Sequence, residues 1–113
     1  MSMNDWSESV LIAELNDEPA LSEDLDTVVR RIENRPESAT DVILNFQAVS
    51  YLNSSNVGQL LRIRKKAVDG GVTLRLCGLH DDPQSVLHVT GLDQLFEITE
   101  DVTLALASVQ IAE

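Results

Sequence analysis

The stretch Asp41-Val-Ile-Leu-Asn-Phe46 and the residues after it decide the fold of this chain. An almost continuous apolar run of this length is typical of a β-strand that is covered on both faces. A loop, Gln47 to Asn53, separates it from a helix predicted from about Ser55 to Asp69, and Gly70-Gly71 ends that helix. A buried strand followed by an amphipathic helix is the repeating unit of an α/β domain.

The segments on both sides repeat this alternation. Val10 to Leu15 reads as a strand, and Ser22 is the expected N-cap of the helix after it. Further strands are predicted at 72–77 and 96–98, with a short helix between them and a final helix near residue 105. The first of these helices is indicated by apolar residues at i, i+3, i+4 and i+7 spacing: Leu25, Val28, Val29 and Ile32.

This order of elements predicts a single compact α/β domain, which suits a length of 113 residues. We expect the domain to span residues 8–112, after an N-terminal tail at residues 1–7. Its sheet should be mixed and mostly parallel, with about four or five strands and about four helices, because strands joined through helices pair in parallel.

The helix predicted at 55–69 separates into an apolar and a polar side, with one exception. Arg64 falls inside the apolar arc, so either its stem lies along the edge of the core or it faces a partner. The apolar side holds Val57, Leu60, Leu61, Ile63, Ala67 and Val68, and the polar side holds Gln59, Arg62, Lys65, Lys66 and Asp69.

Charge and composition exclude several classes of protein. The 19 acidic and 8 basic residues give a net charge of −11, which argues against a nucleic-acid partner. No apolar run approaches the roughly 20 residues that cross a bilayer. With no secretory signal and a single cysteine, Cys77, we expect a cytoplasmic protein. Four of the 8 bases lie within positions 62–66, either as a solvated face or as a basic patch for an acidic partner.

Residues for catalysis or metal binding are sparse. Cys77, His80 and His88 are the only soft or imidazole ligands, so we expect no metal site. Neither a nucleophile elbow nor a glycine-rich phosphate loop follows any predicted strand, so we expect no cofactor and no enzyme. Ser55 with His80 would be the one pair available to a hydrolase.

One polar segment, Asn53-Ser54-Ser55-Asn56, stands between the loop and the second helix. As structure alone it predicts a helix cap, with Asn53 or Ser54 accepting from free backbone N–H groups. A hydroxyl here is also a good phosphoacceptor, because a phosphate would lie at the positive end of the helix dipole.

These residues resemble a STAS domain, the module shared by sulphate transporters and anti-sigma-factor antagonists. The likeness is clear from about 40 to 107. It rests on the stretch 41–56 as a central strand with its signature loop, and on the basic helix that follows. It rests further on Gly71-Val-Thr-Leu-Arg-Leu-Cys-Gly-Leu and on the Thr90-Gly91-Leu92 ending. The resemblance implies a STAS-like fold and a regulatory binding module.

The signature loop departs from the family pattern, which reads Asp-Ser-Ser/Thr-Gly. Asn53 replaces the aspartate and Asn56 replaces the glycine, while Asn45 replaces an aspartate at the end of the preceding strand. Asn56 fits if the glycine served a left-handed conformation, which asparagine enters more readily than most residues. It also adds bulk where a kinase would approach.

The resemblance implies a phosphorylated serine at Ser55, our preferred position, or at Ser54. The leading hypothesis is an anti-sigma-factor antagonist that binds an anti-sigma serine kinase. The alternative is an adaptor subunit of a transporter ATPase or a signalling scaffold, without the phosphate switch. We expect a monomer or weak homodimer with no membrane insertion. The residues expected to contact the protein partner are Tyr51, Gln59, Arg62, Lys65 and Lys66.

Overall fold

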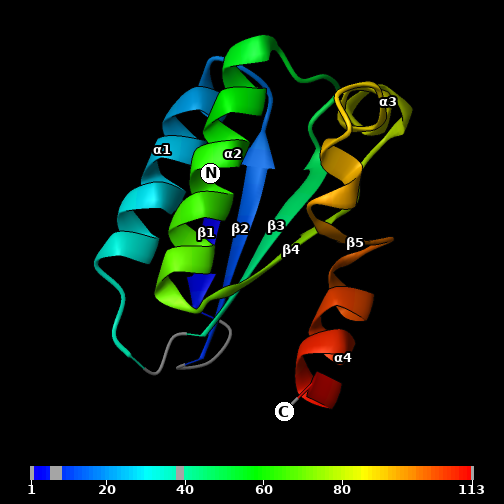
Figure 1. Cartoon of the computed structure of the whole chain (residues 1–113). Helices are drawn as coiled ribbons and strands as arrows, with labels where there is room; N and C mark the ends of the chain where they lie inside the picture. Colours follow the sequence, from blue (N-terminus) through cyan, green and yellow to red (C-terminus); the bar gives the residue numbers. More distant parts are fainter. Residues whose placement is uncertain (1, 6–8, 38–39, 113) are drawn as a thin grey trace.

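A five-stranded sheet forms the centre of the protein in a computed structural model that describes residues 2–5, 9–37 and 40–112 (Figure 1). The strands stand in chain order, and β2 to β5 run parallel while β1 is antiparallel to β2. This confirms the predicted mixed, mostly parallel sheet. The strands are β1 (Ser2–Asp5), β2 (Val10–Asn16), β3 (Asp41–Ala48), β4 (Thr73–Cys77) and β5 (Glu97–Thr99).

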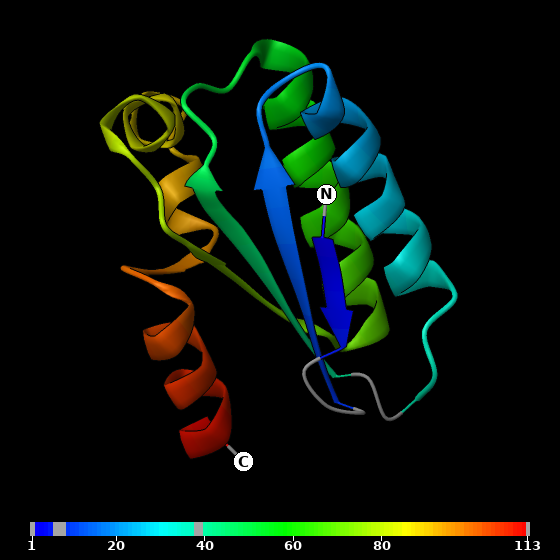
Figure 2. The ribbon, with the colours of Figure 1, turned by 180° about the vertical axis from the view of Figure 1, so that it is seen from behind.

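Helices cover both faces of this sheet (Figures 1 and 2). The first two helices lie side by side on one face, and the last helix contacts β3, β4 and β5. The helices are α1 (Ala20–Glu33), α2 (Ser54–Gly70), α3 (Asp81–Val89), the short 3₁₀ helix η1 (Leu92–Gln94) and α4 (Val102–Ala112).

The central strand β3 contributes to a core on each face of the sheet, as its continuous apolar run predicts. Val42, Leu44 and Phe46 belong to the larger core, which includes the buried sides of α1 and α2. Between them Ile43 points to the other face, where it joins Cys77 and Ala105 of α4. Because successive side chains of β3 point to opposite faces, this one strand packs against the helices on both sides of the sheet.

Two boundary predictions differ from the structure. Part of the segment expected to be a tail, Ser2–Asp5, forms β1 and pairs with β2. Its sequence Ser-Met-Asn-Asp carries no apolar alternation that would indicate a strand. The expected N-cap Ser22 instead lies inside α1, which begins at Ala20, and its N–H and hydroxyl both donate to Glu18.

The helical wheel of α2 was only partly correct. Leu60, Ile63 and Ala67 are buried as expected. Leu61 and Val68, assigned to the same apolar side, are 40% and 63% exposed. The wheel gave the direction of each side chain but not the width of the covered face, which neighbouring elements set.

Candidate protein-binding site at the start of α2

The first turn of α2 is closed by a reciprocal pair of asparagines. The Asn53 side chain accepts a hydrogen bond from the backbone N–H of Asn56 at 2.8 Å. The Asn56 side chain in turn accepts from the backbone N–H of Asn53 at 3.0 Å. The pair satisfies two of the four N–H groups that the start of a helix leaves without a partner. The predicted cap at Asn53 is thereby confirmed.

The second asparagine is helical, and its side chain points inward. Asn56 is the third residue of α2, and no described residue other than glycine has a positive φ. Asn56 therefore does not adopt the left-handed conformation that was considered from the sequence. Asn56 is fully buried, and its amide donates to Glu18 and Gln59. Its bulk adds nothing to the surface that a partner would approach.

Glu18, in the loop between β2 and α1, joins this cap to the first helix. Its carboxylate accepts from the side-chain amides of Asn53 at 3.3 Å and Asn56 at 3.4 Å. It also accepts from the hydroxyl and N–H of Ser22, at 2.6 and 2.7 Å. These hydrogen bonds, led by those from Ser22, hold the pKa of Glu18 below its ordinary value. The contact of Glu18 with this cap has no local sequence signal, because the two asparagines lie 35 and 38 residues away.

A second carboxylate of the same loop, that of Asp17, holds the segment before α2 in place through hydrogen bonds. Asp17 accepts from the N–H of Ser50 at 2.8 Å and from its hydroxyl at 2.7 Å. The two bonds from Ser50 lower the pKa of Asp17. Next to this anchor, the Tyr51 side chain is 49% exposed. The loop therefore holds a half-exposed aromatic ring close in sequence to the two candidate serines.

Ser54 and Ser55 are the first two residues of α2, and both are exposed. Among the residues that the structure describes, neither hydroxyl has a hydrogen-bond partner. At about 100° of rotation per residue, Ser55, Gly58 and Arg62 fall along one exposed side of the helix. A Cβ atom added at Gly58 would meet nothing within 4 Å. The helix backbone is therefore bare between the serine and the arginine.

The partner residues predicted from the sequence divide between two sides of α2. Arg62 is exposed, and Lys65 is exposed beside Asp69, with 3.2 Å between Nζ and the carboxylate. Lys66 instead faces α1, where its ammonium lies 3.2 Å from Glu33. Gln59 also faces α1 and donates to the Ser22 carbonyl at 2.8 Å and to Asp26 at 3.0 Å. Arg62 and Lys65 thus remain on the open surface, whereas Gln59 and Lys66 join the two helices.

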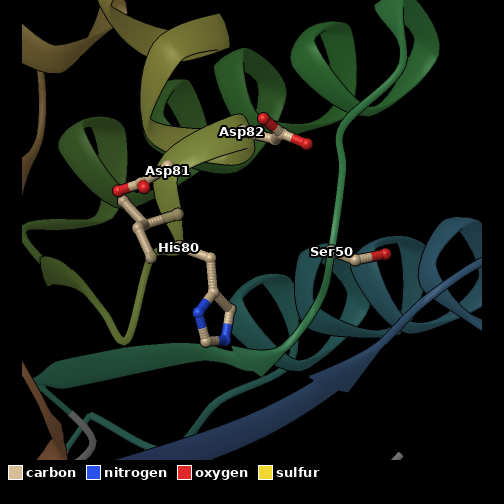
Figure 3. A pocket seen from close by; sticks show the side chains of 5 residues that line it. Ser50, His80, Asp81 and Asp82 are labelled. Carbon is tan, nitrogen blue, oxygen red and sulfur yellow. The ribbon is translucent and has the colours of Figure 1, made fainter.

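A hollow lies beyond the ends of β3 and β4, lined by Ser50, Leu79, His80, Asp81 and Asp82 (Figure 3). The hydroxyl of Ser50 is engaged with Asp17, and Nε2 of His80 lies 2.6 Å from the Gln47 carbonyl. His80 is therefore turned to β3 rather than to Ser55, with which the sequence could have paired it. The two aspartates give the hollow an acidic rim.

Neither a candidate metal cluster nor a helix able to span a membrane occurs in the described ranges. They contain no group of three His, Cys, Asp or Glu residues placed to hold a metal ion. Burial raises the pKa of the Cys77 thiol to about 11, with the charge of Asp101 adding to the effect. None of the described helices is both long enough and apolar enough to cross a membrane.

The fold and this capped, serine-bearing helix define an α/β domain whose open surface suits protein contacts. The STAS domain family matches residues 6–105, and the chain belongs to that family. The predicted resemblance is thereby confirmed, including for the segment before residue 40.

Solved structures share the fold across almost the whole chain. An anti-sigma-factor antagonist (STAS) domain protein from Planctomyces limnophilus has a TM-score of 0.80 at 17% identity, with 95% of each chain covered. The anti-sigma factor antagonist SpoIIAA in its unphosphorylated form has a TM-score of 0.72 at 16% identity, covering 96% of each chain. The Bacillus cell fate determinant SpoIIAA in the phosphorylated form has a TM-score of 0.73 at 18% identity, covering 96% of this chain and 97% of that one.

Proposed function

We propose that this protein is a regulatory binding module, an anti-sigma-factor antagonist, that binds an anti-sigma serine kinase through the surface at the start of α2. The observation that carries the proposal is the alignment of Ser55, Gly58 and Arg62 on one exposed side of the helix. Glycine inside a helix is less favourable than alanine by about 1 kcal/mol, and no contact with the described residues requires it at position 58. A partner that approaches the backbone closely would require it.

Phosphorylation at Ser55 would change this surface through charge. A phosphate adds roughly −1.5 to −2 charges, and the free N–H groups and dipole of the first turn of α2 would stabilise it. The same charge would occupy the bare surface beside Gly58, so a partner that contacts the backbone there would lose its fit. SpoIIAA, which shares the fold, has structures in phosphorylated and unphosphorylated forms. This supports phosphorylation as the switch in the proposal.

Mass spectrometry after incubation with a cognate anti-sigma serine kinase and ATP tests the proposal. We expect one phosphate, on Ser55, which Ser55→Ala abolishes and Ser54→Ala leaves in place. The unphosphorylated protein should form a complex with the kinase. A protein that neither gains a phosphate on Ser54 or Ser55 nor binds such a kinase would contradict it.

A constitutive adaptor, such as a subunit of a transporter ATPase or a signalling scaffold, is the second candidate. It is favoured by the two asparagines, because Asn53 and Asn56 are accounted for by the cap and by Glu18 without any phosphate. Affinity capture by the wild-type protein distinguishes the two functions. A partner retained equally by Ser55→Ala and Ser55→Asp indicates the adaptor, and a partner lost only with Ser55→Asp indicates the switch.

A further inference from the structure

Besides the exposed side that carries Ser55, Gly58 and Arg62, helix α2 has three others, and one of them is apolar without being covered. The first side is buried in the core through Leu60, Ile63 and Ala67. The second faces α1, as the contacts of Gln59 and Lys66 with that helix show. The third side carries Leu61 and Val68, which point in nearly the same direction because they are seven residues apart. They are 40% and 63% exposed.

A hydrogen bond links the third side to the segment between η1 and β5. Arg64, which did not fit the apolar arc of the helical wheel, reaches to this segment and donates from Nε to the Leu95 carbonyl at 3.1 Å. The Leu95 side chain is itself 43% exposed. We call the set Leu61, Val68 and Leu95, with the cations Arg64 and Lys65, the α2–η1 surface.

Cations flank the apolar residues of this surface on both sides. At about 100° per residue, Arg64 lies to one side of the line from Leu61 to Val68 and Lys65 to the other. On a chain of net charge −11, this arrangement places positive charge around exposed apolar groups.

The acids two residues before and after Leu95 in the chain have partners of their own. Asp93 is 2.9 Å from Nδ1 of His88, and Glu97 is 3.3 Å from Nε of Arg75. Lys65 is paired with Asp69, but both side chains are more than half exposed, so that pair is weak and can exchange partners.

We propose that the α2–η1 surface is a second docking site, which takes an acidic amphipathic helix of a partner protein. The apolar face of such a helix would cover Leu61, Val68 and Leu95, and its flanking carboxylates would meet Arg64 and Lys65. A second copy of this chain is disfavoured as the occupant, because a symmetric contact through this surface would set the cations Arg64 and Lys65 of one copy against the same cations of the other. The site goes beyond the proposed function. Leu61 lies about 9 Å along the helix from Ser55 and about 120° away from it, so no phosphate is needed.

Two labelled synthetic peptides of about 18 residues test the proposal. Both carry the same leucines at i, i+3, i+4 and i+7 spacing, flanked by glutamates in one peptide and by lysines in the other. Fluorescence anisotropy should show the glutamate peptide binding at least about tenfold more tightly, and added salt should reduce the difference. Amide NMR shifts should change at 61–68 and 92–96.

Variants identify the residues responsible. Leu61→Ser with Val68→Ser should weaken binding of the glutamate peptide by at least about tenfold. The matched control is Val89→Ser, which alters an apolar residue 83% exposed on α3 and should leave binding unchanged.

Three results would overturn the proposal: no binding of either peptide, equal binding of both, or shifts confined to 49–59. A dimer in sedimentation that Leu61→Ser dissociates would also overturn it, by making a second copy the occupant. None of these measurements involves phosphorylation, so failure here is separate from failure at Ser55.

Discussion

The first turn and the second half of α2 differ in which of their groups the rest of the chain covers. In the first turn, the Asn53–Asn56 pair satisfies the backbone N–H groups of both residues, and Glu18 accepts from their side-chain amides. What remains open there is a pair of hydroxyls and the bare backbone at Gly58. In the second half, the apolar residues Leu61 and Val68 are left exposed between cations.

This difference separates stability from recognition along one element. A buried polar group whose hydrogen bonds are made, such as Asn56, is costly to disturb, so its substitution should affect folding, whereas Ser55 in the same turn is open to a partner. Exposed apolar and charged groups contribute little to folding, so changes in the second half should affect binding alone. The contrast is open to direct measurement in each half.

The largest effect is expected for Asn56→Ala. This substitution removes a fully buried amide and leaves the Asn53 N–H without its acceptor. It should lower the free energy of unfolding by about 2–3 kcal/mol, measured by urea denaturation. Val68→Ala in the exposed half is the matched control, with a change within about 0.5 kcal/mol. Equal losses in the two variants would remove the contrast between the halves.

A smaller effect of opposite sign is expected for Gly58→Ala. Open space surrounds position 58, so alanine should raise the free energy of unfolding by about 0.5–1 kcal/mol. Gly58→Leu should fold equally well, yet weaken the complex with the proposed kinase, because its side chain fills the bare surface. Calorimetric titration of the kinase checks the second part. Full affinity in Gly58→Leu would show that the first turn is not approached closely.

The smallest effect concerns the charge beside the cap. Asn53→Asp replaces a donor to Glu18 with a second carboxylate at about the same place. A double-mutant cycle should therefore show repulsion, with Asn53→Asp more favourable in the Glu18→Gln background than in the wild type. Additive effects would mean that Glu18 and position 53 act independently.

The contribution of Glu18 to the free energy of unfolding should depend on pH. The pKa of Glu18 is lowered in the folded protein, so its contribution to stability is present above the ordinary value of 4.5. It is lost as the pH falls below that value and through the lowered pKa. The loss should be smaller in Glu18→Gln, which urea midpoints measured across this range would show.

Local patterns in the sequence were enough to predict most of the framework. The continuous apolar run of β3 and the Asn53 cap of α2 depend on neighbouring residues, which a single sequence displays. The polar edge strand β1 could not be predicted, because its pairing with β2 depends on backbone hydrogen bonds that any sequence can make. The start of α1 was also misplaced, because the helix begins at Ala20 and Ser22, the expected cap, donates from inside the helix to Glu18.

The serines of the candidate site could be predicted from the sequence, but the residues that hold the loop around them could not. Ser54 and Ser55 follow from the signature loop, whereas Glu18 contacts it across 35 residues of sequence. The exposure of Leu61 could not be foreseen either, since a helical wheel does not show which neighbours cover a side. Arg64 was the one residue that signalled this surface, as the cation out of place in an apolar arc.

The most direct test of the central claim compares the unphosphorylated protein with the same protein phosphorylated on Ser55, each titrated with the cognate anti-sigma serine kinase. The unphosphorylated form should bind, and the phosphorylated form should bind at least about tenfold more weakly, a difference of about 1.4 kcal/mol. Equal affinity of the two forms would contradict the account, because it would mean that the exposed serine beside Gly58 and Arg62 is not a switch.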